Sequence, residues 1–353
     1  MKTMFHLILN ILFKNYIFMK LVKFKAASIQ NSPVYLDAAG TTQKACDLIR
    51  EASKNEAQLI AFPEAFIPAY PYWSWIMSPT KGSSFFERLF LNSITTEGEE
   101  VKQICKAADE NSCFVVIGIN ERCASKTGTI YNTNLTIDSR GNIIGVHRKL
   151  VPTWAEKLVW SGGDGSSLVV HNTEIGMLGT LACGENTNPL ARFTLMSQGE
   201  QVHIANYISL PTAPREYNMA EAIKLRGMTH SFEGKIFTII SCSTICEEII
   251  SEMEVVLPDA RKLLTRKNSA FSGIIGPDGT LIGDGLIDEE GIVYADIDLE
   301  KCIKPKQMHD ILGNYNRFDI FDLRVNTKKQ EVISFEEKNE SERYSGEISE
   351  EKE

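Results

Sequence analysis

The chain of 353 residues contains 43% hydrophobic and 24% charged residues, with 24 glycines and 12 prolines. These proportions are typical of a folded globular protein and exclude a collagen-like, a mostly disordered or a polytopic membrane chain. The formal net charge of −9 argues against non-specific nucleic-acid binding, because such binding needs a basic surface that displaces counterions from phosphate.

Both ends of the chain differ in composition from its middle. The first 18 residues are mostly apolar, but polar and basic residues interrupt the run, whereas a spanning helix needs about 20 apolar residues. We interpret residues 1–18 as a dispensable N-terminal extension, with a weak membrane or targeting signal as the alternative. Residues 327–353 are polar and acidic, which predicts a disordered tail. Residues 19–326 contain no internal repeat and no Pro/Ser-rich linker, so we expect one domain there.

Strand-like and helix-like runs alternate through this middle segment, which is typical of a layered α/β fold. The predicted strands are Val22–Ile29, Gln58–Pro63, Cys113–Asn120, Tyr131–Ile137, Ile143–Leu150, Ser167–Val170, Gly176–Ala182, Val202–Ala205, Ile236–Ser241, Ser269–Ile275 and Gly291–Ile297. The predicted helices, with apolar residues at three- and four-residue spacing, are Leu36–Asn55, Glu97–Asn111, Pro189–Gln198 and Tyr217–Phe232. Turn sequences at Asp138–Asn142 and Gly276–Gly279 indicate antiparallel hairpins within the sheets.

The eight cysteines and six histidines show no metal-ligand spacing. Without a Cys-x-x-Cys pair, neither structural zinc nor a disulfide scaffold is expected, and we predict no metal. Sparse thiols favour a reducing compartment, so we expect a cytoplasmic protein.

The first candidate for chemistry is Glu64, at the end of the strand Gln58–Pro63. An aromatic, proline-rich loop, Phe66–Trp75, follows it. A carboxylate beside aromatic surface can have a raised pKa and act as a base near neutrality. The alternative is an exposed loop carboxylate.

The second candidate is Lys149, near the end of the strand Ile143–Leu150. A lysine that emerges into an enclosed site supplies positive charge to a developing anion. The alternative is an ordinary exposed lysine.

The third candidate is Cys183, where the strand Gly176–Ala182 ends and a helix opens at Asn188 and Pro189. A thiol near a helix N-terminus tends towards thiolate, and Gly184 leaves its backbone N–H free to face an oxyanion. An inert buried cysteine is the alternative.

Ligands of layered α/β folds gather outside the carboxyl ends of strands, so these three side chains could converge. A cysteine, a glutamate and a lysine together suggest nucleophilic catalysis without histidine. Sequence spacing alone does not establish that they meet.

Three blocks of the sequence closely resemble, in the same order, the nitrilase branch of the carbon–nitrogen hydrolase superfamily. They are FPEAFIPAYP (62–71), HRKLVPTWAEKLVW (147–160) and ACGENTNPLARFTLMSQGEQVHIA (182–205), and the likeness extends over roughly residues 20–326. The resemblance implies a four-layer α-β-β-α sandwich that pairs with a second copy through helices, and often assembles into larger homo-oligomers or spirals. It also implies that no cofactor is needed.

The resemblance also assigns roles to single residues. It implies that Glu64 is the general base, that Lys149 stabilises tetrahedral intermediates and that Cys183 is the nucleophile. Glu156 matches a second, structural or water-positioning glutamate. Cys183 is followed here by Gly184-Glu185-Asn186, where many relatives have Trp-Glu-His, so their substrate preference cannot be carried over.

The implied substrate is a small organic nitrile, and we expect a carboxylic acid and ammonia to form through a thioimidate and a thioester on Cys183. A nitrile is uncharged, so its pocket should be mainly apolar. The candidate pocket residues are Tyr70, Tyr72, Trp73, Trp75, Trp154, Trp160 and Asn186. Packing or subunit contact is the alternative for the aromatic residues, and a structural role is expected for Arg192 and His203. Nucleic-acid and membrane partners are not expected.

Three other functions remain open at this point. An amidase of the same superfamily would use the same three residues on an amide. A hydratase-like reaction would release an amide from the nitrile. A non-catalytic assembly protein would keep only the fold.

Overall fold

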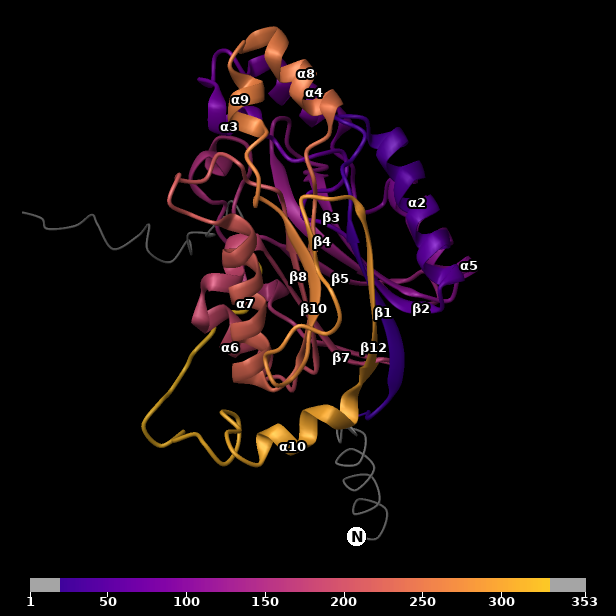
Figure 1. The fold of residues 1–353 in the computed structure, drawn as a ribbon, viewed down its shortest axis with the longest axis vertical. Coiled ribbons are helices and arrows are strands. Elements are labelled where there is room, and N and C mark those ends of the chain that lie inside the picture. The colour runs from indigo at the N-terminus through magenta and orange to yellow at the C-terminus, as the bar shows by residue number, and fades with distance from the viewer. Residues whose placement is uncertain (1–19, 331–353) are drawn as a thin grey trace, which may run out of the picture.

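The chain alternates strands and helices in the computed structural model, which describes residues 20–330 (Figure 1). The interpretation of residues 1–18 and the prediction for residues 331–353 of the tail lie outside this range. Between residues 20 and 330, every helix is too short or too polar to cross a bilayer.

The strands form two half-sheets that are joined at one corner. The first half has the order β5-β4-β3-β2-β1-β12, and the second has the order β10-β9-β8-β7-β6. The two halves meet where Gln30 of β1 pairs with Cys242 of β9. Strands β1, β2 and β3 run parallel, as do β7, β8 and β9, while the outer strands pair antiparallel. The strand bounds are β1 Lys23–Gln30, β2 Ala57–Ala61, β3 Phe114–Arg122, β4 Ile130–Ile137, β5 Ile143–Arg148, β6 His171–Thr173, β7 Gly176–Ala182, β8 Val202–Tyr207, β9 Phe237–Cys242, β10 Phe271–Ile275, β11 Leu286–Ile287 and β12 Gly291–Asp298.

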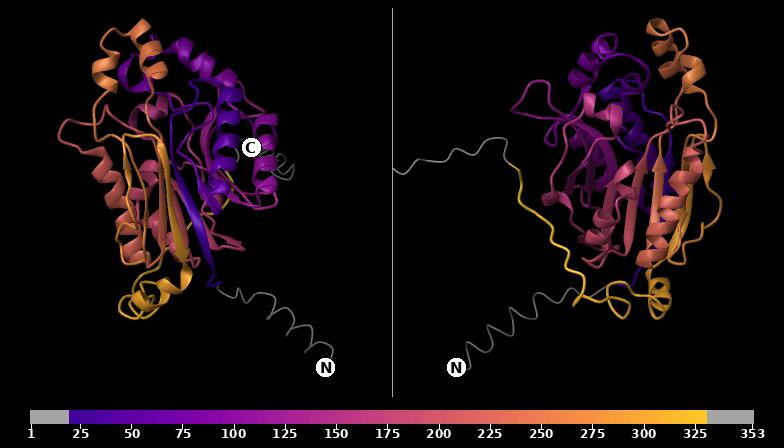
Figure 2. Two further views of the ribbon diagram at one scale, coloured as in Figure 1. Left: turned by 45° about the vertical axis from the view of Figure 1, so that its right-hand side comes forward. Right: turned by 90° about the vertical axis from the view of Figure 1, so that its left-hand side faces the viewer.

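Alternating side chains of each strand divide the core into layers. In β3, Phe114 and Val116 pack between the half-sheets, whereas Val115 and Ile117 pack under helices. Helices α2 (Ala38–Lys54) and α5 (Glu99–Glu110) cover one outer face, and α6 (Pro189–Met196) and α7 (Met219–Gly234) cover the other (Figure 2). The expected four-layer α-β-β-α sandwich is therefore confirmed.

Buried amides connect the two half-sheets. Asn134 of β4 donates to Thr180 Oγ1 of β7 at 2.9 Å and to Asn206 Oδ1 of β8 at 3.1 Å. Asn206 donates back to Asn134 Oδ1 at 2.6 Å. Unpaired amides would be costly in this apolar layer, so the network favours one relative position of the sheets.

One predicted strand, Ser167–Val170, is wrong. The structure has a 3-10 turn at Gly165–Ser167, and the strand β6 begins at His171. Asp164 accepts a hydrogen bond from the Ser166 N–H and bends the chain, and the Val170 N–H donates to the Gln198 side chain instead of to a strand.

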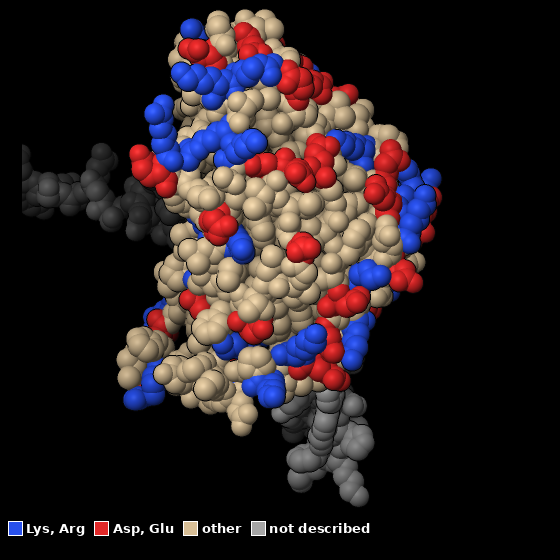
Figure 3. Space-filling view, in the orientation of Figure 1, with Lys and Arg blue, Asp and Glu red and all other residues tan. Residues whose placement is uncertain are grey.

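Several short helices were not predicted. Three of them have only four or five residues, and the mixed apolar and polar runs of the other two hide their period. They are α3 Trp73–Ile76, α4 Ser83–Asn92, α8 Glu247–Val256, α9 Ala260–Leu264 and α10 Ile303–Lys306. Helices α3, α4, α8 and α9 gather at one end of the sandwich, and α10 lies at the other (Figure 1). On the face drawn in Figure 3, acidic and basic side chains are interspersed.

Candidate active site

Three predicted side chains lie at carboxyl ends of strands and are buried. Glu64 follows β2, Lys149 directly follows β5 and Cys183 directly follows β7. Their exposed fractions are 0%, 1% and 8% respectively. An exposed loop carboxylate at 64 and an ordinary exposed lysine at 149 are therefore excluded.

Lys149 bridges two carboxylates. Its Nζ donates to Glu64 Oε1 and to Glu156 Oε2, each at 2.7 Å. Although burial lowers the pKa of the Lys149 ammonium, the charges of Glu156 and Glu64 raise it well above its usual value. The lysine is therefore a fixed cation at neutral pH.

Glu156 is held by further donors. It lies in a 3-10 turn, Trp154–Leu158, where Thr153 N–H donates to its Oε2 at 2.7 Å. Tyr70 OH donates to its Oε1 at 2.8 Å. The indole N–H of Trp75 donates to the Tyr70 oxygen at 2.7 Å, so the aromatic loop positions this carboxylate.

Glu64 is held by backbone contacts at the junction of both half-sheets. Its N–H donates to the carbonyl oxygen of Tyr207, the last residue of β8, at 3.2 Å. The loop passes close over Gly118 of β3, where a Cβ would lie 2.5 Å from the Pro63 carbonyl oxygen. Glycine is required at this crossing.

The carboxylate of Glu64 has one bound and one free oxygen. Asn132 Nδ2 of β4 donates to Oε1 at 2.7 Å, while Oε2 is buried and has no hydrogen-bond partner within residues 20–330. Burial raises the pKa of Glu64 to about 7; Lys149 opposes this rise, and the charge of Glu156 adds to it. Such a carboxylate can exchange a proton near neutral pH.

Cys183 opens a 3-10 turn, Cys183–Thr187, with a positive φ of 48°. This left-handed conformation costs roughly 1–3 kcal/mol in a residue with a side chain, and it is frequent at functional sites. Asn186 Nδ2 donates to the carbonyl oxygens of Cys183 and Leu181, each at 3.1 Å, and holds the turn.

The Cys183 thiol is protonated at rest. Burial raises its pKa well above the usual value, and the charge of Glu64 raises it further, while Lys149 and Arg226 lower it. Burial and two carboxylates thus oppose the thiolate that a nearby helix N-terminus favours. The thiol needs a base, and Glu64 is the carboxylate with the greatest influence on it.

Gly184 follows Cys183 directly. A Cβ at this position would lie 3.0 Å from Thr153 Oγ1, so a larger side chain requires the Thr153 side chain to move by a few tenths of an ångström. The oxyanion role of the Gly184 N–H stays a prediction.

Glu185 is a site residue that sequence reasoning missed. It accepts from the N–H groups of Ala182 at 2.8 Å and Leu150 at 2.6 Å, and it bonds His147 Nε2 at 3.0 Å. This buried carboxylate thus ties the Cys183 turn to the Lys149 loop. The signal in the sequence was that Glu185 matches the glutamate of the Trp-Glu-His segment that many relatives have after the cysteine.

Asn132 was also missed. It is the first of two asparagines, Asn132 and Asn134, that point to one side of the strand β4. The available signal was a pair of asparagines, a residue type that is rare in strands, at a spacing of two.

A buried polar chain lies behind Asn186. His203 bonds Asn186 Oδ1 at 2.8 Å and Glu200 Oε1 at 2.7 Å, and His230 Nε2 bonds Glu200 Oε2 at 2.9 Å. One ligand atom each of Glu200, His203 and His230 lies within 4.8 Å of the others, a spacing at which side chains hold metal ions. Both ring nitrogens of His203 are used in hydrogen bonds to Glu200 and Asn186, which supports the expected structural role of His203, whereas His230 Nδ1 is buried without a partner among residues 20–330. Arg192 is also used structurally, in an ion pair with Glu233.

The aromatic pocket candidates fall into two groups. Tyr70 and Trp160 line the ion cluster, with their rings 5.5 Å apart and the Trp160 ring 5.9 Å from Lys149 Nζ. Tyr72 is also buried, and its OH lies 3.4 Å from Ser243 Oγ. Trp73 stacks on Phe85 of α4 instead, and Trp154 is 70% exposed beside Trp75.

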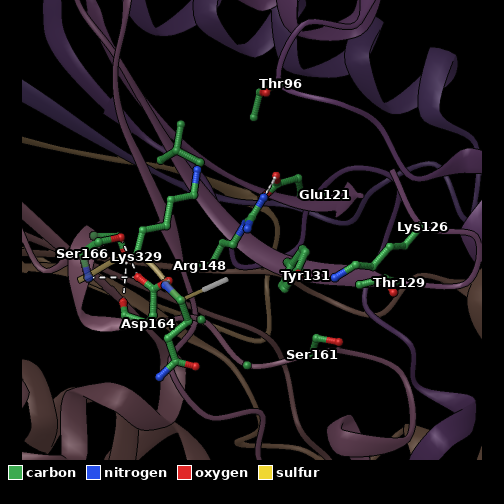
Figure 4. Close-up of a pocket in the computed structure, with 15 residues that line it drawn as sticks. Thr96, Glu121, Lys126, Thr129, Tyr131, Arg148, Ser161, Asp164, Ser166 and Lys329 are labelled. Atoms are coloured by element: carbon green, nitrogen blue, oxygen red, sulfur yellow. Dashed lines mark hydrogen bonds and ion pairs between the residues drawn. The ribbon is translucent and has the colours of Figure 1, made fainter. Parts of the chain in front are cut away.

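A surface cavity of about 730 Å³ lies on the other side of β5 (Figure 4). Arg148 lines it, because neighbouring residues of a strand point to opposite faces. Arg148 donates to Glu121 and stacks over Tyr131 at 4.0 Å, so its charge is already paired. Glu64, Lys149, Glu156 and Cys183 do not line this cavity.

The sandwich and the sequence together define the class of protein. The family model described as carbon-nitrogen hydrolase matches residues 25–307, and the chain belongs to this family. An aliphatic nitrilase of Rhodococcus rhodochrous is 37% identical over 311 residues, which cover 86% of this chain and 83% of that enzyme. A cyanide hydratase of Gibberella zeae is 33% identical over 329 residues, which cover 90% of each chain.

Solved structures agree on the architecture. A carbon-nitrogen hydrolase from Helicobacter pylori G27 superimposes with a TM-score of 0.66 at 20% identity, over 84% of this chain and 97% of that chain. This likeness concerns the fold alone.

Proposed function

We propose that this protein is a nitrilase, which hydrolyses an organic nitrile to the carboxylic acid and ammonia. Its nitrilase relatives support this activity. The observation that carries the mechanism is the buried cluster of Glu64, Lys149 and Glu156 beside a protonated Cys183 thiol.

In the first step, Glu64 accepts the thiol proton through its unpartnered oxygen as the sulfur attacks the nitrile carbon. A C–S bond forms, and one π bond of C≡N becomes a lone pair on nitrogen. Lys149 and the Gly184 N–H stabilise this negative charge, and the proton returned by Glu64 gives the thioimidate.

In the second step, Glu64 takes a proton from water as the oxygen adds to the thioimidate carbon. Protonation of nitrogen lets the C–N bond break, which releases ammonia and leaves a thioester. A second water attacks the thioester in the same way, and the C–S bond breaks to give the carboxylic acid and the thiol. Two water molecules are consumed for each nitrile.

The tetrahedral adduct formed by water and the thioimidate can also break down in a second way. If the C–S bond breaks before the C–N bond, an amide leaves and only one water is used. The similarity to a cyanide hydratase makes this a specific second candidate.

Product analysis tests both proposals. We expect purified protein to release acid and ammonia in equal amounts from a panel of aliphatic and aromatic nitriles. Amide as the main product would favour the hydratase reaction, and turnover of amides alone would favour an amidase. Protein inert towards nitriles and amides would support a non-catalytic role.

We also propose that the protein forms a homodimer through its outer helices. Leu190 of α6 and Leu225 and Phe232 of α7 are 57–63% exposed, which supports burial of this face against a second copy. Light scattering should give at least a dimer, and Leu225→Asp should dissociate it. The eight cysteines, all within the described residues and all free thiols, support the proposed cytoplasmic location.

A further inference from the structure

Two buried hydrogen-bond donors near Cys183 have no acceptor within residues 20–330. They are the hydroxyl of Tyr207 and the Nη1 group of Arg226. Buried donors without partners are rare in folded proteins and are costly to keep, above all when charged. Neither donor takes part in the reaction steps proposed above.

Arg226 is fixed at the edge of the Cys183 turn. Its Nε donates to Oγ1 of Thr187, the last residue of that turn, at 2.6 Å. Its Nη2 donates to the Tyr217 hydroxyl at 2.7 Å. Two of the three nitrogens are thus held by partners near the surface, and the third is buried with its two protons unused.

Tyr207 approaches the same place from the sheet. It ends β8, and its side chain is fully buried in one apolar cluster with Cys183 and with Ile223 of α7. Ile223 lies one helical turn before Arg226, on the neighbouring part of the same helix face.

The charges of these groups act on one another, in agreement with this placement. The Arg226 guanidinium lowers the pKa of the Cys183 thiol, against the larger effect of burial. It likewise opposes the rise in the pKa of Tyr207 that burial causes. Arg226, Tyr207 and the thiol therefore share one poorly hydrated region.

The acceptor that suits this pair is a carboxylate. A guanidinium is always charged and makes its strongest hydrogen bonds with carboxylates, and a tyrosine hydroxyl can supply a second donor to the other oxygen. The cyano group itself is neutral and has to lie against Cys183 and Lys149, so it cannot occupy this place.

We propose that Arg226 and Tyr207 bind a carboxylate of the substrate, and that the preferred substrates are nitriles with a carboxylate remote from the cyano carbon. This inference rests on the proposed nitrile hydrolysis and replaces the expectation of a mainly apolar pocket. The carboxylate would orient the cyano carbon towards Cys183 by anchoring the far end of the molecule.

The kinetic test compares matched nitriles. Each cyanocarboxylate, with one to four methylene groups between its ends, is paired with the neutral nitrile in which a methyl group replaces the carboxylate. We expect wild-type kcat/KM to favour the cyanocarboxylate at one spacer length. Arg226→Leu should lower this preference by about 100-fold or more, and Tyr207→Phe by about tenfold, because each removes one donor to a buried anion.

The control removes the same charge elsewhere. Arg50→Leu on α2, in the opposite outer layer, should leave the preference unchanged. Equal losses on both members of a pair in Arg226→Leu and Tyr207→Phe, or a wild-type preference for the neutral nitriles, would overturn the carboxylate site.

A binding experiment tests the carboxylate site independently of nitrile hydrolysis. Calorimetry with Cys183→Ala protein should detect the cyanocarboxylate and should show at least tenfold weaker binding when Arg226→Leu is added. If wild-type protein hydrolyses no nitrile but this Arg226-dependent binding occurs, nitrile hydrolysis is wrong and the anion site stands. If neutral nitriles are hydrolysed and binding does not depend on Arg226, the anion site is wrong and the hydrolysis stands.

Discussion

Lys149 Nζ and Glu64 Oε1 lie 2.7 Å apart with both side chains fully buried. Because Glu156 approaches the same ammonium at the same distance, the cluster contains one cation and two carboxylates. It can therefore take up one proton without losing its internal attraction, and this is the property that the proposed base needs.

Replacement of Lys149 should abolish activity and destabilise the fold. In Lys149→Met the two carboxylates face each other without a cation, which should lower the free energy of unfolding by about 3–5 kcal/mol. Urea unfolding measures this change. The double variant Lys149→Met/Glu156→Gln should regain part of the stability but stay inactive. An active single variant would remove Lys149 from the chemistry.

The pH profile should report Glu64. The base must be ionised, and its pKa is about 7, so kcat/KM should fall about tenfold per unit as pH drops below 7 and level off above it. Glu156→Gln removes a negative charge that raises this pKa, so its midpoint should move to lower pH. Glu51→Gln, on the exposed side of α2, should not move it. A flat profile from pH 5 to 8 would contradict the assignment.

Cys183→Ala should lose turnover by at least about 10⁴-fold while the protein stays folded, since the covalent route is removed. Circular dichroism and the unfolding midpoint check the fold. Cys46→Ala, another buried thiol, in α2, is the matched control and should remain active. Rates like those of the wild type in the Cys183 variant would exclude a thioimidate.

The buried Glu200 and His230 pair should make stability pH-dependent. Burial lowers the pKa of His230 to about 4, against 6.5 for a free histidine. The unfolded chain then binds a proton that the folded His230 refuses, so the contribution of His230 to stability is lost as pH falls from 6.5 to 4, by roughly 3 kcal/mol. Glu64, whose pKa is raised to about 7, contributes in the opposite direction over this range, so the effect of His230 is measured against a variant that lacks it.

Urea unfolding at pH 7 and pH 5 measures this loss. Glu200 does not titrate between these pH values, because His203 and His230 lower its pKa to about 2 against the effect of burial. His230→Gln should remove the His230 contribution, so the variant should lose less stability than the wild type between pH 7 and pH 5, by about 2 kcal/mol. An unchanged difference in that variant would show that another group is responsible.

Deletion of residues 1–18 should leave activity unchanged, because the first described strand begins only at Lys23. Deletion of residues 1–24 is the contrasting control, since it removes the buried Phe24 and should reduce soluble protein. Loss of enzyme in the shorter deletion would contradict the extension hypothesis.

Limited proteolysis followed by mass spectrometry should find early cuts beyond residue 326.

The sequence predicted the parts of the site that end a strand. Glu64, Lys149 and Cys183 each follow an apolar run whose end can be recognised, and the family blocks added Glu156. Asn132 and Arg226 could not be predicted from the sequence, because each acts through a contact with a segment that is distant in the chain. Asn132 acts on Glu64 from 68 residues away.

The same distinction explains the elements that were missed. Helices such as α3 and α9 are stabilised by packing at the end of the sandwich, and their own four or five residues contain too little pattern to be recognised. The long helices, whose apolar period extends over two turns or more, and the buried strands, which are continuous apolar runs, were predicted with ends within a few residues of those in the structure.

The site is divided between the two half-sheets, since Glu64 and Lys149 follow strands of one and Cys183 follows a strand of the other. A slight sliding of one half over the other would separate the base from the sulfur while the strand pairs within each half stayed intact. Misplacement by about 1 Å can cost about 10²-fold in rate. Substitutions in the apolar layer between the half-sheets, around Phe114 and Val202, should thus lower the rate before they lower the stability of the fold appreciably. This layer, although distant from the site, is therefore a place where engineering can adjust activity.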